Sequence, residues 1–345
     1  MRPRNNFECL RILAALVVIY GHAFPLTATS APSLFFGSIQ AVAVKIFFSI
    51  SGYLVTKSLM KDGDITNYLS KRIRRIFPGL IVVVIVCAFV IGPLVSTLDF
   101  AQYFGSPTFK TYFRNIFMYP VYNLPGVFES NSYPVAVNGS LWSLPVEFLM
   151  YLVLVPVFML TTMANRISLI LVAITTCAAS LYFTHLVPGK WRYVVYGSDL
   201  IMALDVIPYF FIGGCLARFM IPGVLDMGWA LFLVLLISLM QVINPVLAEL
   251  ALYAVGPYVI ISFAVSSTPF LREAGKYGDP SYGIYLYGFP VQQCIIYMCG
   301  GHMSPVLNAI ISIPICIGLG YLSWHFVEKR FLPAVSHPLI KRGVV

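Results

Sequence analysis

The 345-residue sequence predicts an all-α polytopic membrane protein with about ten transmembrane helices. Hydrophobic residues make up 59% of the chain and charged residues only 10%, whereas a soluble domain carries roughly 25% charged residues. Apolar runs recur along the whole chain, each near the ~20 residues that cross a bilayer. Lys and Arg gather in the short segments between these runs, as they do in cytoplasmic loops.

The apolar runs divide the chain into successive helices with no internal repeat, so we expect one transmembrane domain over 1–345. The first run, with its preceding Arg2 and Arg4, imitates a cleavable signal peptide. We interpret it as a retained helix, because His22 interrupts it and the later helices need a first span to set their orientation. The expected spans are 7–27, 35–60, 76–98, 141–163, 167–187, 199–220, 226–243, 246–266, 281–299 and 304–326.

The distribution of basic residues predicts that both termini are cytoplasmic. With the N-terminus inside, the outer ends of the spans hold only Lys110, Arg114, Lys190 and Arg192, and the other loop Lys and Arg residues lie inside. The longest stretch between spans, 99–140, is then an outer loop. It is rich in Tyr, Phe, Pro and Asn. Its aromatic rings suit either the faces of sugars or an aromatic belt at the membrane interface.

Charge and cysteine content exclude two classes of function. The net charge is +9, but the basic residues lie in short loops and form no soluble basic face, so no nucleic-acid partner is expected. The seven cysteines are scattered through apolar runs without a CxxC pair. We interpret them as small buried hydrophobic residues and expect no metal site.

The first helix carries two ionisable residues on one face. The eleven positions from Arg11 to His22 correspond to about three turns plus ~20° and to ~16 Å along the axis. Glu8 precedes Arg11 by three positions, which suggests a Glu8–Arg11 pair. An ionisable residue as deep as His22 indicates a functional site, and imidazole is a suitable general base near neutral pH. The alternative is a structural histidine that bonds to a neighbouring helix.

Several motifs in order along the chain resemble the acyltransferase 3 family of integral membrane acyltransferases. The match begins with Arg11 and His22 at the family's spacing, and it extends to about residue 330. One departure is Gly288, where the family often has histidine. The other matching segments are 8–15 (ECLRILAA), 47–54 (FFSISGYL), 72–78 (RIRRIFP), 138–147 (NGSLWSLPVE) and 281–290 (SYGIYLYGFP).

The resemblance implies an O-acyltransferase in the cytoplasmic (inner) membrane. Its expected donor is cytoplasmic acetyl-CoA, and its expected acceptor is a hydroxyl of an envelope glycan or glycolipid, such as O-antigen or exopolysaccharide. Besides acyl-CoA and this acceptor, membrane lipid is the remaining expected partner. Some family members carry an appended soluble hydrolase-like domain, and none is expected within these 345 residues.

His22 and Glu147 are the expected catalytic residues. His22 acts either as the base that deprotonates the acceptor hydroxyl or as the carrier of the acyl group. Glu147 is expected to hold the imidazole in its useful tautomer, with a helix-terminal role as the alternative.

The donor is expected to meet basic and small residues. Arg11, Arg72, Arg74 and Arg75 are expected to grip its phosphates, although the cluster at 72–75 also suits a topology anchor. Ser51, with Ser49 and Gly52, leaves room for the pantetheine arm or permits close helix packing.

Other functions stay open at this level. Asp205 is an intramembrane carboxylate that suits a polar cavity or a pair with Lys or Arg. An acyltransferase acting on a lipid, a peptide or a small metabolite would have the same motifs. A transporter or flippase could use intramembrane Glu, Asp and His as a proton relay, but the missing internal repeat disfavours it.

Overall fold

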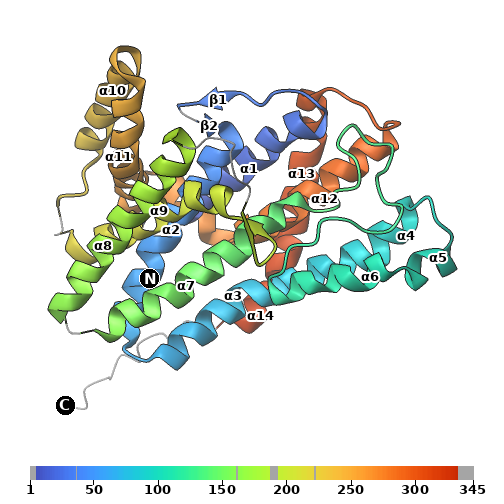
Figure 1. Cartoon of the computed structure of the whole chain (residues 1–345), viewed down its shortest axis with the longest axis horizontal. Helices are drawn as coiled ribbons and strands as arrows, with labels where there is room; N and C mark the ends of the chain where they lie inside the picture. Colours follow the sequence, from blue (N-terminus) through green and yellow to red (C-terminus); the bar gives the residue numbers. More distant parts are fainter. Residues whose placement is uncertain (1–4, 36, 161, 187–192, 221–222, 333–345) are drawn as a thin grey trace, which may run out of the picture.

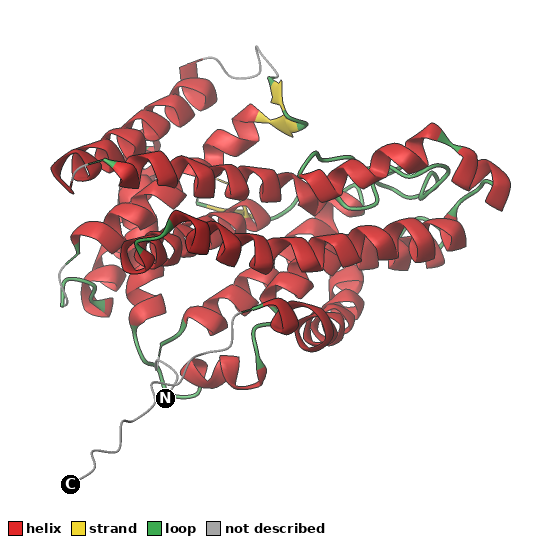
Figure 2. Cartoon of the chain, turned by 90° about the horizontal axis from the view of Figure 1, so that it is seen from below, coloured by secondary structure: helices red, strands yellow, loops and turns green. Residues whose placement is uncertain are grey.

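The computed structural model describes residues 5–35, 37–160, 162–186, 193–220 and 223–332. The described chain is almost entirely helical, with two short antiparallel hairpins (Figure 2). Its elements are α1 Phe7–Leu26, β1 Ser33–Leu34, β2 Gly37–Ser38, α2 Ile39–Asp62, α3 Ile65–Val86, α4 Gly92–Val95, α5 Phe100–Gly105, α6 Pro107–Tyr112, α7 Ser143–Met159, α8 Thr162–Leu181, β3 Val194–Val195, β4 Ser198–Asp199, α9 Leu200–Phe219, α10 Met227–Ile243, α11 Pro245–Val265, α12 Ser281–Met298, α13 Pro305–Ser323 and α14 Lys329–Phe331.

The predicted fold class is confirmed, and each of the ten expected spans contains a helix. Two of these helices, α10 and α12, fall outside the group that is long and apolar enough to cross a membrane by length and composition. In the described chain, the group of helices long and apolar enough to cross a membrane has eight members: Phe7–Leu26, Ile39–Asp62, Ile65–Val95, Gly139–Met159, Met163–Thr184, Leu200–Phe219, Leu247–Val265 and Pro305–Phe331. Lys190 and Arg192, which were assigned to an outer loop, lie outside the described residues.

The third span begins earlier than its apolar run, so the predicted start at 76 is wrong. The Asp64 side chain accepts hydrogen bonds from the backbone N–H groups of Thr66 (3.0 Å) and Asn67 (3.2 Å), which caps the N-terminus of α3. The apolar run used for the prediction ends at the first charged residue, whereas the capping residue determines where the helix begins. As a result, Arg72 and Arg75 lie within α3 rather than in a loop.

Helix α2 lies at the centre of the bundle and contacts α1, α9 and α11 (Figure 1). Its contact with α9 brings the backbones together: Gly52 lies against the carbonyl of Phe210, and Gly213 of α9 lies against the carbonyl of Ser49. The small residues on this face of α2 therefore permit close packing. Ser51 lies on another face, which leaves it available to the site described below.

Replacement of Gly52 by alanine is expected to disrupt this contact. The added Cβ would overlap the Phe210 carbonyl, and a backbone atom cannot move aside without separating α2 from α9. We expect Gly52→Ala to lower the melting temperature of the detergent-purified protein by several degrees or to abolish its folded yield, as overpacking typically costs about 1–3 kcal/mol. Gly318→Ala is the matched control, since nothing lies within 4 Å of its added Cβ. Equal effects of the two substitutions would contradict this packing.

Two further contacts join neighbouring helices in the described chain, and the second confirms the ion pair that was one of the two roles open for Asp205. Asn244 and Pro245 join α10 and α11 in a helical hairpin on one side of the bundle (Figure 1), and the Asn244 side chain accepts from the N–H of Leu247 (3.2 Å). Asp205 of α9 pairs with Lys45 of α2, with 2.8 Å between Oδ1 and Nζ. This pair joins α2 to α9.

Candidate active site

A cavity of about 320 Å³ lies between α1, α2, α3, α7 and α12. On α2 its lining runs from Val44 to Val55, which is ~16 Å along the helix axis. Helices α1 and α12 contribute residues from their first two turns, α7 from its first three turns, and α3 from its middle, residues 71–76. The two ends of the cavity differ in chemistry.

One end of the cavity is basic and the other is apolar. Arg11, Lys71, Arg72 and Arg75 line the first end, which we call the basic mouth. The opposite end is lined mostly by the apolar or aromatic side chains of Val44, Phe47, Leu144 and Tyr285, with Ser143 beside Tyr285. Such a gradient suits an elongated ligand with an anionic head and a less polar tail.

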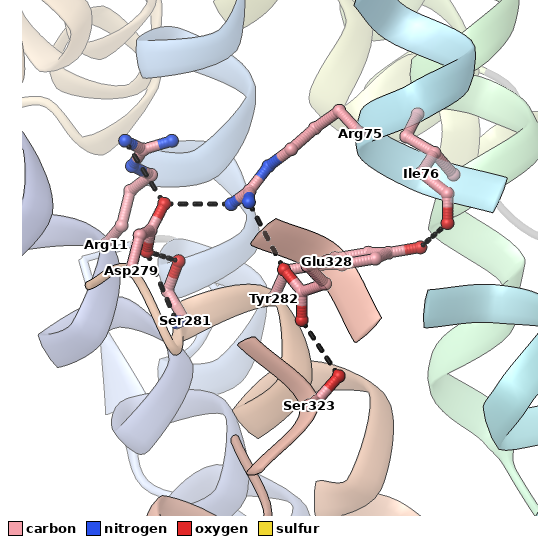
Figure 3. A network of polar contacts seen from close by, with 8 residues as sticks. All are labelled: Arg11, Arg75, Ile76, Asp279, Ser281, Tyr282, Ser323 and Glu328. Atoms are coloured by element: carbon pink, nitrogen blue, oxygen red, sulfur yellow. Dashed lines mark hydrogen bonds and ion pairs between the residues drawn. The ribbon is translucent and has the colours of Figure 1, made fainter. Parts of the chain in front are cut away.

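At the basic mouth, two of the four expected arginines are held by carboxylates (Figure 3). Asp279 Oδ2 lies 3.3 Å from Arg11 Nη2 and 2.8 Å from Arg75 Nη2. Arg75 Nη1 lies 3.2 Å from Glu328 Oε2, and Glu328 is 1% exposed. The expected Glu8–Arg11 pair is wrong: Arg11 pairs with the buried Asp279, and Glu8 packs against Gly275 instead.

Asp279 is the central residue of this network. Burial opposes its charge, but the neighbouring Arg11 and Arg75 outweigh the burial and hold the pKa of Asp279 at about 2. The Ser281 hydroxyl and N–H also donate to its Oδ1, at 2.5 and 3.3 Å. Asp279 and Glu328 were not recognised in the sequence, because nothing near them in the chain marks them as partners of Arg11 and Arg75.

Arg72 differs from the other basic residues of the mouth. Among the described residues it has no carboxylate partner, whereas Lys71 pairs with Asp62 at 2.7 Å. The Arg72 guanidinium lies over the rings of Tyr68 and Tyr151, 5.9 Å from each centroid. Its Nε is buried without a hydrogen-bond partner. Arg72 is thus the cavity-lining arginine best able to take an anionic ligand.

The remaining expected arginine, Arg74, does not line the cavity. It lies on the exposed face of α3. The chain therefore does not bring Arg11, Arg72, Arg74 and Arg75 together as one set of equivalent cations: two are paired, one is unpaired in the cavity, and one is outside it.

Glu147 and Ser51 meet in the middle of the cavity, together with Tyr151. The hydroxyls of Ser51 and Tyr151 each donate to Glu147 Oε1 at 2.6 Å, and the two hydroxyl oxygens lie 2.9 Å apart. No described residue donates to Glu147 Oε2. Tyr151 was missed in the sequence, although its position four residues after Glu147 places both on one face of α7.

His22 lies beyond the apolar end of the cavity and does not line it. Its ring meets Phe289 of α12 edge-on, with centroids 5.6 Å apart, and Phe289 also packs against Tyr133 of the 99–140 segment. Among the described residues the imidazole makes no hydrogen bond. Glu147 binds Ser51 and Tyr151 rather than His22, so the expected Glu147–imidazole contact is not formed.

Gly288 explains how α12 approaches the first helix next to His22. A Cβ at this position would lie 2.8 Å from Cγ1 of Ile19, one turn before His22. A histidine here would therefore require the Ile19 side chain or α1 to shift. The glycine lets α1 and α12 pack closely and brings Phe289 against the His22 ring.

Comparison with known proteins identifies the family. The family model described as "Acyltransferase domain" matches residues 4–325. An O-acetyl transferase of Shigella phage Sf6 is 30% identical over 98% of this chain and 99% of its own length. The peptidoglycan O-acetyltransferase OatA of Listeria monocytogenes is 25% identical over 99% of this chain and 56% of its own length.

A third relative matches a smaller part of the chain. Nodulation protein 10 of Rhizobium leguminosarum is 35% identical over 44% of this chain and 43% of its own length. No solved structure matches. Because the family model and the phage relative both span nearly the whole sequence, the chain belongs to the acyltransferase domain family, whose members include membrane O-acetyltransferases, and it is a multi-pass membrane protein of that family.

Proposed function

We propose that this protein transfers an acetyl group from cytoplasmic acetyl-CoA to a hydroxyl of an envelope glycan or glycolipid. The observation that carries the proposal is the polarised cavity, which runs from the basic mouth through Ser51, Glu147 and Tyr151 to an apolar end near His22. The names of the phage and Listeria relatives support acetyl as the acyl group, and the name of the Listeria relative supports a glycan as the acceptor.

The donor is expected to enter through the basic mouth. Its nucleotide phosphates would meet Arg72, the unpaired arginine of the cavity, with Arg74 on the exposed face nearby. Guanidinium groups match phosphate oxygens in geometry and charge. The thin pantetheine arm would pass Ser51, and Glu147 Oε2 would accept a hydrogen bond from one of its amide N–H groups.

Two chemical routes at His22 are compatible with this layout. In the direct route the imidazole takes the proton of the acceptor hydroxyl while its oxygen attacks the thioester carbon. The C–S bond breaks, and the thiolate of coenzyme A leaves and takes up the proton. In the covalent route an imidazole nitrogen attacks the thioester carbon, the C–S bond breaks, and the coenzyme A thiolate leaves with the imidazole proton. The acceptor hydroxyl oxygen then attacks the acetyl carbon, the bond from that carbon to the imidazole breaks, and the hydroxyl proton passes to the released imidazole.

The acceptor is expected at the opposite end of the bundle from the donor. Phe289 touches both His22 and Tyr133, which links the histidine to the aromatic 99–140 segment. In this proposal that segment lies outside the cytoplasm and holds the glycan. His22 then stands between the donor cavity and the acceptor segment.

The proposal is tested with sealed inside-out membrane vesicles. We expect acetyl-labelled acetyl-CoA, added to the exposed cytoplasmic face, to transfer label to an envelope glycan supplied in the lumen. Right-side-out vesicles given the same donor are expected to transfer none. Label recovered in membrane lipid or in a small metabolite would mean that the acceptor is that molecule and not a glycan. An absence of transfer from acetyl-CoA would contradict the donor assignment.

Substitution of Arg72 is expected to weaken donor binding. A charge-assisted hydrogen bond contributes about 1.5–3 kcal/mol, so Arg72→Ala should raise the dissociation constant of acetyl-CoA by about 10–100-fold. The measurement is equilibrium binding to the purified protein in detergent. Lys110→Ala, a loss of one positive charge in the 99–140 segment, is the control and should leave the constant unchanged. An unchanged dissociation constant of acetyl-CoA in Arg72→Ala would mean that Arg72 does not bind the donor and serves only as a topology anchor.

A further inference from the structure

Two aromatic rings close the apolar end of the cavity. Phe47 of α2 and Tyr285 of α12 meet edge-on, with ring centroids 5.9 Å apart and planes at 68°, and both line the cavity. The Tyr285 hydroxyl is fixed twice: it lies 2.6 Å from Ser143 Oγ, and it donates to the Ser140 carbonyl at 2.9 Å. Tyr285 is 7% exposed. These contacts hold both rings in place, so the two rings form a fixed wall at this end of the cavity.

This wall lies between the cavity and His22. Phe47 packs against a buried cluster that includes Ala15 and Ile19 of α1, and Ile19 is one turn before His22. Tyr285 is one turn before Phe289, which touches the His22 ring. An acyl group that comes from the cavity to His22 must therefore occupy the space beside these two rings.

We propose that the Phe47–Tyr285 pair is the size filter for the acyl group and restricts transfer to short chains such as acetyl. This inference rests on the proposed function, because it assumes that the donor thioester lies in the cavity. A two-carbon acyl group adds only a methyl beyond the carbonyl carbon. Each further methylene must displace a ring that is held by its partner ring and, at Tyr285, by two hydrogen bonds.

The expected magnitude follows from what one methylene is worth in a tight apolar pocket. Discrimination by one methylene is typically about 10–200-fold in kcat/KM. We expect the wild-type protein to use butyryl-CoA at least about 10-fold less efficiently than acetyl-CoA. Phe47→Ala removes one ring of the wall and leaves the basic mouth and Glu147 intact. It should raise the butyryl-to-acetyl ratio of kcat/KM by about tenfold or more.

The experiment compares acetyl-, propionyl- and butyryl-CoA in the vesicle assay. Phe77→Ala is the matched control, because Phe77 is also a half-buried ring with an edge-on partner, Phe148 at 5.6 Å, but does not line the cavity. Phe47→Leu serves where the alanine variant does not fold, and it should raise the ratio by a smaller factor. Tyr285→Phe keeps the ring but removes both hydrogen bonds, and it should also raise the ratio.

The outcomes separate this inference from the proposed function. If wild-type vesicles transfer no acetyl from acetyl-CoA, the proposed donor is wrong and the filter is overturned with it. If acetyl transfer occurs but Phe47→Ala and Phe47→Leu keep the wild-type butyryl-to-acetyl ratio, the filter alone is overturned. A ratio raised equally in Phe77→Ala would also overturn it, because the effect would then come from a general loosening of the bundle.

Discussion

His22→Ala is expected to reduce acetyl transfer to the background rate. A positioned general base contributes about 10²–10⁴-fold to the rate of a proton transfer, and an acyl carrier contributes at least as much because no other route remains. The physical basis is the position of His22 between the apolar end of the cavity and the 99–140 segment. The measurement is label transfer from acetyl-CoA in inside-out vesicles at matched protein levels.

The control for His22→Ala is His325→Ala. His325 is exposed, stacks on Tyr321 and does not line the cavity, so its loss should leave transfer near the wild-type rate. Acetyl transfer that survives unchanged in His22→Ala would remove the histidine from the mechanism. Transfer lost equally in both variants would point to a general effect of removing an imidazole.

The same variant distinguishes the two routes of transfer. With labelled acetyl-CoA and no acceptor, the covalent route predicts label bound to the wild-type protein, released by hydroxylamine and absent from His22→Ala. The direct route predicts no bound label. Transfer to the glycan would be lost in His22→Ala under either route, so the trapping experiment decides between them.

Asp279→Ala is expected to produce the largest loss of stability. Removing this carboxylate leaves Arg11 and Arg75 side by side without the partner that they share, and Arg75 keeps only Glu328. Breaking a buried ion pair by removing one partner typically costs about 3–5 kcal/mol. We expect a free energy of unfolding lower by about that amount in detergent, measured by denaturant titration.

Glu273→Ala is the matched control from the same connection between α11 and α12. Its carboxylate lies 3.7 Å from Arg272 and is 61% exposed, and an exposed pair contributes about 0–1 kcal/mol. A loss in Asp279→Ala no larger than in Glu273→Ala would contradict the structural role of the network. Asp279→Asn keeps the hydrogen-bonding shape and should recover part of the loss if the alanine variant does not fold.

The pKa of Asp279 gives this stabilisation a definite pH range. The folded-state pKa is about 2, below the ordinary value of 3.8. A lowered carboxyl pKa means that the stabilisation is complete above the ordinary pKa and is lost as pH falls toward the folded one. The difference between wild type and Asp279→Asn should therefore shrink as the pH falls between about 4 and 2.

The helices could largely be predicted from the sequence because the membrane imposes a one-dimensional rule. A span needs a long apolar run, and each of the ten predicted runs contains a helix. The rule failed at the start of α3, where Asp64 caps a helix that continues through Lys71, Arg72 and Arg75. Hydropathy reports where lipid is tolerated, whereas hydrogen bonding determines where a helix begins.

The roles of the site residues depended on packing that no local pattern reveals. Asp279 and Glu328 lie more than two hundred residues from Arg75. Only the packing of α3 against α12 and against the π-helical segment Trp324–Glu328, which follows α13, makes them partners. The predicted phosphate grip of four arginines therefore divides into a structural pair, Arg11 and Arg75, and an unpaired Arg72. Glu147 likewise meets Ser51 and Tyr151 because α2 crosses α7 there, while His22 lies farther along α1.

By itself, the sequence determined the membrane class, the helix positions and the placement of Arg11 and His22 three turns apart on one helix. These depend on apolar length and helical period, which are properties of neighbouring residues. Only the tertiary structure decided which cation is free, which carboxylate faces the cavity and what separates the cavity from His22. Those features arise from contacts between helices far apart in the sequence, where burial favours the pairing of charges and the close packing of rings.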